Sequence, residues 1–200
     1  MDQGVVSGTN EFFVVNSLNS RALFLDRDGV INLDTGYVSK VEEIEFIEGI
    51  FDLVRTALSL GYRVIVVTNQ SGIGRGYFTE KDFSELMEWM REKFLAERCS
   101  LDRIYFCPFH PDDGVGEYRR DSAMRKPQPG MVLQAISDFS LDPGKCVLVG
   151  DRLSDIEAGR SAGVRHLFLL SAPTSVAGVT DFYVVQNLQA VSDFIQELER

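Results

Sequence analysis

The sequence predicts an α/β fold with an open, mostly parallel β-sheet and helices on both faces. Short apolar runs alternate along the 200 residues with longer segments whose apolar residues recur every three or four positions, which is the order of strands and helices in such sheets. The runs show no polar alternation, as expected for strands buried on both faces. With 44% hydrophobic residues the chain can bury one sizeable core.

The first strand is expected at Ala22–Leu25, in the centre of the sheet. Residues 1–20 precede it as an extension with a candidate edge strand at 12–15, and residues 21–200 form the predicted domain. Further strands are expected at 63–68, 104–107, 146–149, 166–170 and near 182–185. Helices are expected at 48–60, from 79 onward, and at 131–139, 154–162 and 188–198. Gly61 is placed to end the first helix, and Thr79 with Asp82 forms a capping-box pattern at the start of the second.

Composition and charge exclude several classes of function. A formal net charge of −10 argues against nucleic-acid backbones as partners. Three cysteines form no disulfide framework, and their odd number fits a reducing cytosol. The start of the chain lacks the basic-then-apolar order of a secretory signal, and no run is long enough to span a membrane. We therefore expect a cytoplasmic protein that acts on a small molecule and is monomeric.

Two carboxylates follow the first strand directly. Asp26 and Asp28 lie two positions apart, so both side chains leave an extended backbone on the same side. Two nearby carboxylates disfavour each other's ionisation, and a Mg²⁺ ion with its preference for carboxylate, water and phosphate oxygens would relieve this. The alternative is a structural turn, because Asp28-Gly29 is a turn-forming pair.

Polar residues also follow other predicted strands. In open α/β sheets ligands bind at the carboxyl ends of the strands, so these residues are expected to converge on one crevice. They are Asp26 and Asp28, Thr68 and Asn69, Arg125 and Lys126, and Asp151 and Asp155.

These motifs, in this order, resemble the four motifs of the haloacid dehalogenase (HAD) superfamily of phosphohydrolases. The resemblance covers about residues 21–170, and four motifs in order are far more specific than any one of them. The segments VVTNQSGIGRG at 66–76 and RKPQPGM at 125–131 are similar to the branch that contains the D-glycero-D-manno-heptose 1,7-bisphosphate phosphatases and the histidinol-phosphate phosphatases. The fold implied is Rossmann-like.

The resemblance implies a role for each motif residue. Asp26 would be the nucleophile that forms an aspartyl-phosphate, and Asp28 the general acid and base. Thr68 and the backbone N–H of Asn69 would hold phosphoryl oxygens, while Lys126 would balance charge on nucleophile and phosphate.

The same resemblance implies Mg²⁺ as the cofactor, held by Asp26, Asp151 and the backbone carbonyl of Asp28. For Asp155 two roles stay open. It would support the metal shell, or it would only stabilise the first turn of a helix, where residues 154–157 form a capping-box pattern.

Four arginines in or beside the motif loops are candidate substrate contacts in this acidic chain: Arg27, Arg75, Arg125 and Arg152. In the resembling branch the arginine before the motif lysine, here Arg125, meets the phosphate that is retained. For Arg27 and Arg152 the alternative is that they neutralise neighbouring aspartates. Glycines 72, 74 and 76 form either a flexible turn or a loop folded over the substrate.

Two departures bear on the substrate. The branch usually carries a zinc loop of the form Cys-x-His followed by Cys-x-Cys. Here Cys107 keeps the first position, but Phe109, Ser122 and Met124 occupy the others, so no zinc is expected and residues 108–124 must be held by other contacts or be mobile. The loops after the first and third strands are too short for a separate cap domain.

The resulting expectation is a Mg²⁺-dependent phosphatase that converts D-glycero-D-manno-heptose 1,7-bisphosphate to heptose 1-phosphate. The alternatives are a phosphatase of histidinol phosphate or of another small phosphate monoester, and a noncatalytic binding protein on the same fold. The intact Asp26, Asp28, Lys126 and Asp151 argue against a noncatalytic protein.

Overall fold

The computed structural model describes residues 20–170 and 181–198. All but the last residue of the predicted extension 1–20, and the candidate edge strand at 12–15, lie outside these residues. Within the described part, none of the helices combines the length and the apolar character needed to cross a lipid bilayer.

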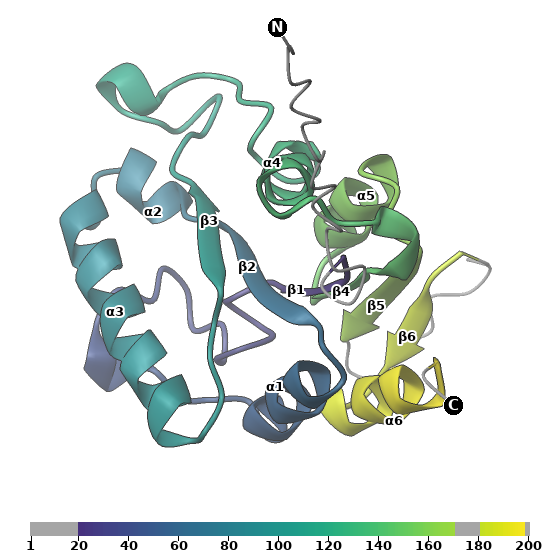
Figure 1. Ribbon diagram of the computed structural model, residues 1–200. Coiled ribbons are helices and arrows are strands. Elements are labelled where there is room, and N and C mark those ends of the chain that lie inside the picture. The colour runs from purple at the N-terminus through teal and green to yellow at the C-terminus, as the bar shows by residue number, and fades with distance from the viewer. Residues whose placement is uncertain (1–19, 171–180, 199–200) are drawn as a thin grey trace, which may run out of the picture.

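A single six-stranded parallel sheet forms the centre of the fold (Figure 1). The strands run in the order β3-β2-β1-β4-β5-β6, so the first strand in the chain lies between β2 and β4. Their bounds are β1 Ala22–Leu25, β2 Arg63–Asn69, β3 Arg103–Cys107, β4 Val147–Gly150, β5 His166–Leu170 and β6 Tyr183–Val185. The predicted parallel sheet is thereby confirmed, and its strands begin and end within about a residue of the expected positions.

Helices cover both faces of the sheet, also as predicted (Figure 1). Helices α1 (Ile50–Ser59), α3 (Glu80–Ala96) and α6 (Leu188–Leu198) pack on one face, and α4 (Gly130–Phe139) and α5 (Leu153–Ser161) on the other. Successive residues of β1 alternate between the two cores: Leu23 and Leu25 pack with the first group, Ala22 and Phe24 with the second. All four are fully buried, which explains the unbroken apolar run.

In the part of the chain that the structure describes, four short helices lie in the connections: η2 (Val41–Glu43), α2 (Ser71–Gly74), η3 (Gly116–Tyr118) and η4 (Pro143–Lys145). Helix α2 corrects the interpretation of Gly72 and Gly74 as part of a turn or a substrate loop. Both glycines are buried in this helix, where a Cβ on Gly72 would lie 2.3 Å from the Phe78 ring and one on Gly74 would lie 2.3 Å from the Pro108 carbonyl oxygen. Close packing, rather than flexibility, therefore requires glycine at these two positions.

The connection after β3, residues 108–124, lies over α2 and the start of α3 (Figure 1). The Val115 N–H donates to the Gly74 carbonyl at 2.8 Å, and the Tyr118 hydroxyl donates to Glu80 at 2.9 Å. The sequence left two expectations for this segment, that contacts other than zinc hold it or that it is mobile. The structure shows such contacts. Nowhere in residues 20–170 and 181–198 is there a separate cap domain, so these short segments form the cover of the sheet's carboxyl edge.

Candidate active site

A cavity of about 550 Å³ opens at the carboxyl ends of the central strands. Its lining includes residues that follow β1, β2 and β4 and the segment before α4, and of the eight residues predicted for the crevice it includes all except Asp151. Among the lining residues are Asp26, Asp28, Thr68, Asn69, Arg75, Arg125, Lys126, Arg152 and Asp155. The convergence expected from parallel strand ends is thus observed.

Lys126 lies at the floor of this cavity between two carboxylates. Its Nζ is 2.9 Å from Asp26 Oδ1 and 2.5 Å from Asp155 Oδ1, and it donates to the Val67 carbonyl at 2.8 Å. An ammonium has three N–H donors, so all three have a partner here. The Lys126 and Asp155 side chains are each only 2% exposed, so this ion pair is shielded from solvent.

Asn69 fixes the backbone of Lys126. Its side-chain oxygen accepts from the Lys126 N–H at 3.0 Å, and its Nδ2 donates to the Lys126 carbonyl at 3.0 Å. Because these two hydrogen bonds reach the N–H and the carbonyl of the same residue, together they hold the backbone of Lys126 in place. The motif at the end of β2 therefore orients the lysine that precedes α4, a function that the sequence-based assignment of Asn69 did not include.

Burial and mutual repulsion raise the pKa values of two aspartates in the site. Burial raises the pKa of Asp26 to about 7, with Asp155 and Asp151 adding to the shift and Lys126 opposing it. Burial likewise raises the pKa of Asp151 to about 6, and the charge of Asp155 contributes. Burial alone would lower the pKa of Lys126, but Asp26 and Asp155 outweigh that effect and raise it. The single positive charge of Lys126 thus balances only part of the negative charge of the neighbouring aspartates.

Three carboxylates of this cluster fit a divalent cation. Oxygens of Asp26, Asp151 and Asp155 lie within 4.8 Å of one another. Asp151 Oδ1 is buried and has no hydrogen-bond partner within residues 20–170 and 181–198, which is costly for a carboxylate unless a cation contacts it. Gly29 makes room for this side chain, since a Cβ there would lie 2.3 Å from Asp151 Oδ2. A hard cation with oxygen ligands is the group that such a donor set suits.

Of the two roles that the sequence left open for Asp155, stabilisation of the first turn of α5 is confirmed, and support of the metal shell stays a prediction. Oδ1 contacts Lys126, whereas Oδ2 accepts from the Arg152 N–H at 3.0 Å and so caps α5. The capping pair is therefore residues 152 and 155, and the pattern predicted at 154–157 is wrong by two positions because the helix begins at Leu153.

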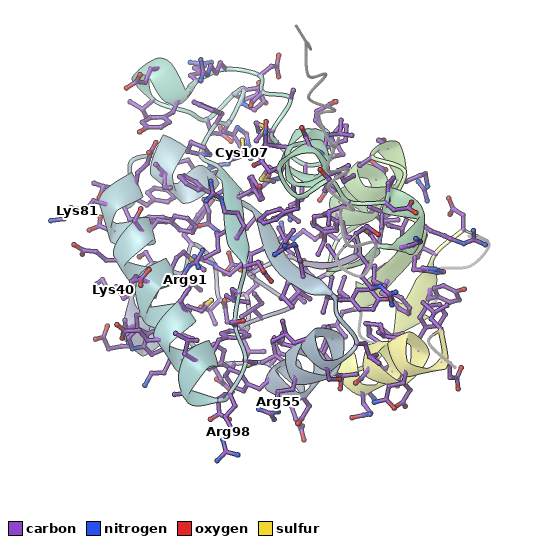
Figure 2. The ribbon with its side chains drawn as sticks, in the orientation of Figure 1. Lys40, Arg55, Lys81, Arg91, Arg98 and Cys107 are labelled. Carbon is purple, nitrogen blue, oxygen red and sulfur yellow. The ribbon has the colours of Figure 1, made fainter. Side chains whose placement is uncertain are left out.

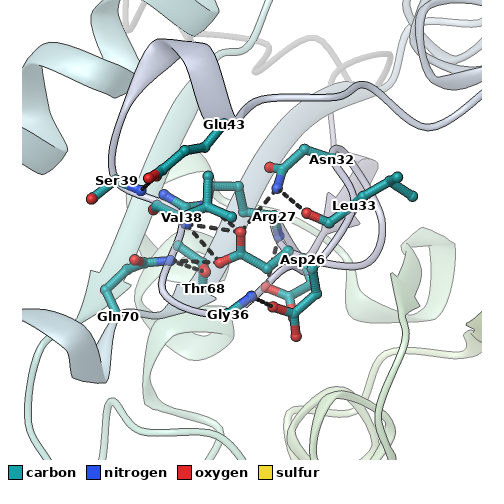
Figure 3. A network of polar contacts seen from close by, with 12 residues as sticks. Asp26, Arg27, Asn32, Leu33, Gly36, Val38, Ser39, Glu43, Thr68 and Gln70 are labelled. Atoms are coloured by element: carbon teal, nitrogen blue, oxygen red, sulfur yellow. Dashed lines mark hydrogen bonds and ion pairs between the residues drawn. The ribbon is translucent and has the colours of Figure 1, made fainter.

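Asp28 is held by a network of three side chains, Arg27, Asn32 and Gln70, which are labelled in Figure 3. Arg27 contacts its Oδ2 at 2.7 Å, and Asn32 and Gln70 donate from their amides at 3.0 and 3.1 Å. Gln70 also donates to the Thr68 hydroxyl at 2.9 Å, linking the ends of β1 and β2. Asn32 and Gln70 are site residues that sequence reasoning missed. The sequence offered one signal for both residues, namely that each is a polar residue a few positions after one of the motifs.

Arg27 corrects one predicted substrate contact. Its side chain is fully buried, and Nη2 donates to the Val38 carbonyl as well as to Asp28, so the guanidinium does not line the cavity. Arg27 instead neutralises the neighbouring Asp28, which is the alternative that the sequence left open. Arg152 does line the cavity, at its rim, where it pairs with Asp34 at 2.6 Å and is 66% exposed.

A positively charged wall is formed by the other two predicted arginines. Arg75 pairs with Asp113 at 2.6 Å, and Arg125 donates to the Phe109 carbonyl at 3.1 Å. Burial lowers the pKa of Arg125, and the neighbouring charge of Arg75 adds to this effect. His110 belongs to the same wall, with Nε2 3.4 Å from Arg75 Nη2. The sequence alone assigned no role to His110.

The positions of the branch's zinc ligands take part in packing here. Cys107 is buried near the end of β3 (Figure 2), and Phe109 and Met124 pack against the core that it joins. Ser122 Oγ accepts from the Met124 N–H at 3.1 Å. By contrast, the charged side chains of Lys81 and Arg98 point away from the ribbon (Figure 2). Apolar contacts and backbone hydrogen bonds thus join these four positions.

Comparisons with known proteins agree with this geometry. A family model described as HAD-hydrolase-like matches residues 123–191. A D-glycero-alpha-D-manno-heptose-1,7-bisphosphate 7-phosphatase of Burkholderia mallei is 50% identical over 179 residues, covering 89% of this chain and 95% of that relative. A D-glycero-beta-D-manno-heptose-1,7-bisphosphate 7-phosphatase of Haemophilus influenzae is 41% identical, covering 90% of this chain and 98% of that relative.

Among solved structures, a D,D-heptose 1,7-bisphosphate phosphatase from B. bronchiseptica, complexed with magnesium and phosphate, is similar with a TM-score of 0.76. It is 28% identical in sequence, and the match covers 88% of this chain and 99% of that one. The agreement extends over nearly the whole length of both proteins.

Proposed function

Because this chain belongs to the HAD-like hydrolases, in the family of the heptose 1,7-bisphosphate 7-phosphatases, we propose that it removes the phosphate at C7 of D-glycero-D-manno-heptose 1,7-bisphosphate and leaves heptose 1-phosphate. It is a phosphoric monoester hydrolase of the HAD type. The observation that carries the proposal is the contact of Lys126 with both Asp26 and Asp155 at the carboxyl ends of the central strands. Beside them, Asp151 Oδ1 is buried without a hydrogen-bond partner among the described residues.

In the proposed reaction Asp26 attacks phosphorus. Its Oδ1 already accepts from the Arg27 N–H at 2.7 Å and from Lys126, which leaves Oδ2 to form the new bond. As this P–O bond forms, the bond from phosphorus to the sugar oxygen breaks, and Asp28 gives that oxygen a proton. Water then attacks the aspartyl-phosphate, Asp28 takes its proton, and Asp26 is regenerated with release of phosphate.

Other residues hold the reacting groups. Lys126 balances the charge of the nucleophile and of the phosphoryl oxygens, and Thr68 and the Asn69 N–H would contact those oxygens. Arg27, Asn32 and Gln70 orient Asp28 toward the cavity. Mg²⁺, held by Asp26, Asp151 and the Asp28 carbonyl, would supply positive charge that keeps Asp26 ionised and polarises the phosphate. Asp155 then acts through Lys126 and as a cap for α5.

Phosphate release from a small panel tests this proposal. The panel contains heptose 1,7-bisphosphate, fructose 1,6-bisphosphate and histidinol phosphate, each with Mg²⁺ or with EDTA. We expect Mg²⁺-dependent turnover that is fastest for the heptose ester, and loss of turnover in Asp26→Asn, which keeps the size of the nucleophile and removes its charge.

The other outcomes discriminate the alternatives. Preference for histidinol phosphate by orders of magnitude would keep the mechanism and change the substrate. Activity that survives in Asp26→Asn would overturn the nucleophile, and a lack of release from every ester would favour the noncatalytic protein.

A further inference from the structure

Backbone hydrogen bonds from the loop that carries His110 favour one tautomer of its ring, although the Asp113 carboxylate also lies 3.5 Å from Nδ1. Its Nδ1 accepts two backbone hydrogen bonds, from the N–H of Asp113 at 3.1 Å and from that of Asp112 at 3.3 Å. A ring nitrogen that accepts N–H donors carries no proton of its own, so the neutral imidazole bears its proton on Nε2. The backbone of residues 112 and 113 thereby makes Nε2–H a hydrogen-bond donor.

This donor faces a second one across the cavity wall. Nε2 lies 3.4 Å from Arg75 Nη2, and since an arginine has only donors, the two groups cannot bond to each other. They are instead spaced so that one oxygen atom could accept from both. Arg75 Nε is also buried without a hydrogen-bond partner among the described residues. The wall thus presents more N–H donors than it has acceptors for.

The charge of this wall defines what would satisfy it. Arg75 and Arg125 bring two guanidinium charges close together, and the carboxylate paired with them is Asp113, which holds Arg75 at 2.6 Å. An anionic group with several oxygens, such as a phosphate, would accept the unused donors and balance the remaining charge. The His110 side chain is only 15% exposed, so a hydrogen bond from it would be partly shielded from water.

We propose that His110 is a specificity-determining residue, whose Nε2–H donates to an oxygen of the substrate phosphate that is not hydrolysed and shares that oxygen with Arg75. The proposal rests on the proposed function, because it assigns the second phosphate of a bisphosphate to this wall. His110 is placed to distinguish a bisphosphate from a monophosphate, and it takes no part in the transfer of the other phosphate to Asp26.

Two substitutions of His110 test the roles of the two ring nitrogens one at a time. His110→Asn places an amide oxygen near Nδ1, which keeps the acceptor for residues 112 and 113, and removes the donor at Nε2. His110→Gln places an amide nitrogen near Nε2, which keeps a donor and removes the Nδ1 acceptor. Glu117→Gln, an exposed change in the same loop, is the matched control.

The substrates form a second matched pair. Heptose 7-phosphate carries the same scissile phosphate as heptose 1,7-bisphosphate and lacks the other one. In His110→Asn we expect the KM for the bisphosphate to rise about tenfold or more, with kcat within about twofold and with the KM for the 7-phosphate unchanged. His110→Gln should recover part of the discrimination, and Glu117→Gln should match the wild type. An equal rise of both KM values, or no rise, in His110→Asn would overturn the proposal.

A direct measurement of the tautomer covers the case in which a variant does not fold. The chain has only two histidines, His110 and His166, so a nitrogen NMR spectrum of the labelled wild-type protein can be assigned with one His166→Gln sample. We expect an unprotonated Nδ1 and a protonated Nε2 in His110, and a shift of the Nε2–H signal on addition of heptose 1-phosphate. A proton on Nδ1, or an Nε2–H signal that does not respond, would overturn the proposal.

The two proposals fail in different ways. If the wild-type enzyme does not hydrolyse the heptose bisphosphate, both fall. If it does so with high preference and His110→Asn keeps the wild-type ratio of the two KM values, the proposed function stands and the role of His110 falls.

Discussion

Lys126 is the residue on which the charge balance of the site depends. It is the ammonium in contact with Asp26 and Asp155, and Asp151 lies beside them. In Lys126→Met, which has a similar length and no charge, we expect kcat to fall at least about 100-fold, because the attacking carboxylate and the phosphate lose their counter-charge. Assays of kcat at saturating Mg²⁺ measure this loss.

Stability is also expected to fall in Lys126→Met. Removal of one partner from a buried ion pair typically costs about 3–5 kcal/mol in the free energy of unfolding, although protonation of Asp26 would relieve part of it. Lys145→Met is the control, since that lysine is half-exposed and its nearest carboxylate, Asp142, is 3.6 Å away. A Lys126→Met protein with the kcat of the wild type would contradict the assigned role.

Single residues also show how far the sequence could predict the site. Asp26, Lys126 and Asp155 were expected to meet because each belongs to a motif at one edge of a parallel sheet. For Arg27 the sequence left two roles open, and the structure shows neutralisation of an aspartate, because its guanidinium contacts Asp28 and lies 5.6 Å from the Phe83 ring centroid. The role of His110 depends on which backbone N–H groups its ring meets, and no spacing in the sequence reveals that.

At the scale of elements, helix α2 connects the active site with the loop above it. Gly74 lies against the Pro108 carbonyl, and its own carbonyl accepts from Val115. A methyl group at Gly74 would lie 2.3 Å from a backbone oxygen that cannot rotate away. We therefore expect Gly74→Ala to lower the free energy of unfolding by about 1–3 kcal/mol. It should also raise KM, because the loop carrying His110 would be displaced.

Thermal unfolding and steady-state kinetics measure both effects of Gly74→Ala. Lys81→Ala, at the exposed start of α3, is the control and should change stability by less than about 0.5 kcal/mol. Wild-type stability in Gly74→Ala would mean that the loop moves away without cost, and so that it does not depend on α2.

The elements themselves differ in how well the sequence predicted them. Strands β1 to β5 were predicted closely because an apolar run buried on both faces has few alternatives. Helix α2 was missed because glycine has a low helix propensity, and the reason for glycine there is a contact with Pro108 from a distant part of the chain. The start of α5 was misplaced because Ser154 and Glu157 match the capping-box pattern, whereas the actual N-cap residue is Arg152, a residue type outside that pattern.

The whole molecule assembles the carboxylate cluster from distant segments. Asp26 follows β1, Asp151 follows β4 and Asp155 lies in α5, so the cluster exists only when the sheet is formed. A cation that binds this cluster therefore stabilises the entire fold by mass action. Binding of the cation also depends on pH, because the cation requires ionised carboxylates.

Without metal, stability is expected to fall as pH rises from about 4 to about 7. Asp26, with a pKa raised from 3.8 to about 7, and Asp151, raised to about 6, bind protons in the folded protein over a range in which the unfolded chain has released them. The folded state is therefore favoured at the acidic end of this range, and this contribution is lost as the pH passes the folded pKa values. Mg²⁺ should act in the opposite sense, with its largest increase in Tm above about pH 7.

Melting curves between about pH 5 and pH 8, with EDTA or with Mg²⁺, test this linkage. Other acids also titrate in this range, so the comparison with Asp26→Asn isolates the nucleophile. Because the amide has no charge to bury, this variant should gain stability over the metal-free wild type at pH 8 and lose that advantage toward pH 5. It should also respond less to Mg²⁺. An increase in Tm from Mg²⁺ that is equal at both pH values in the wild type would separate the metal from the carboxylate cluster, and the assignment of its ligands would have to change.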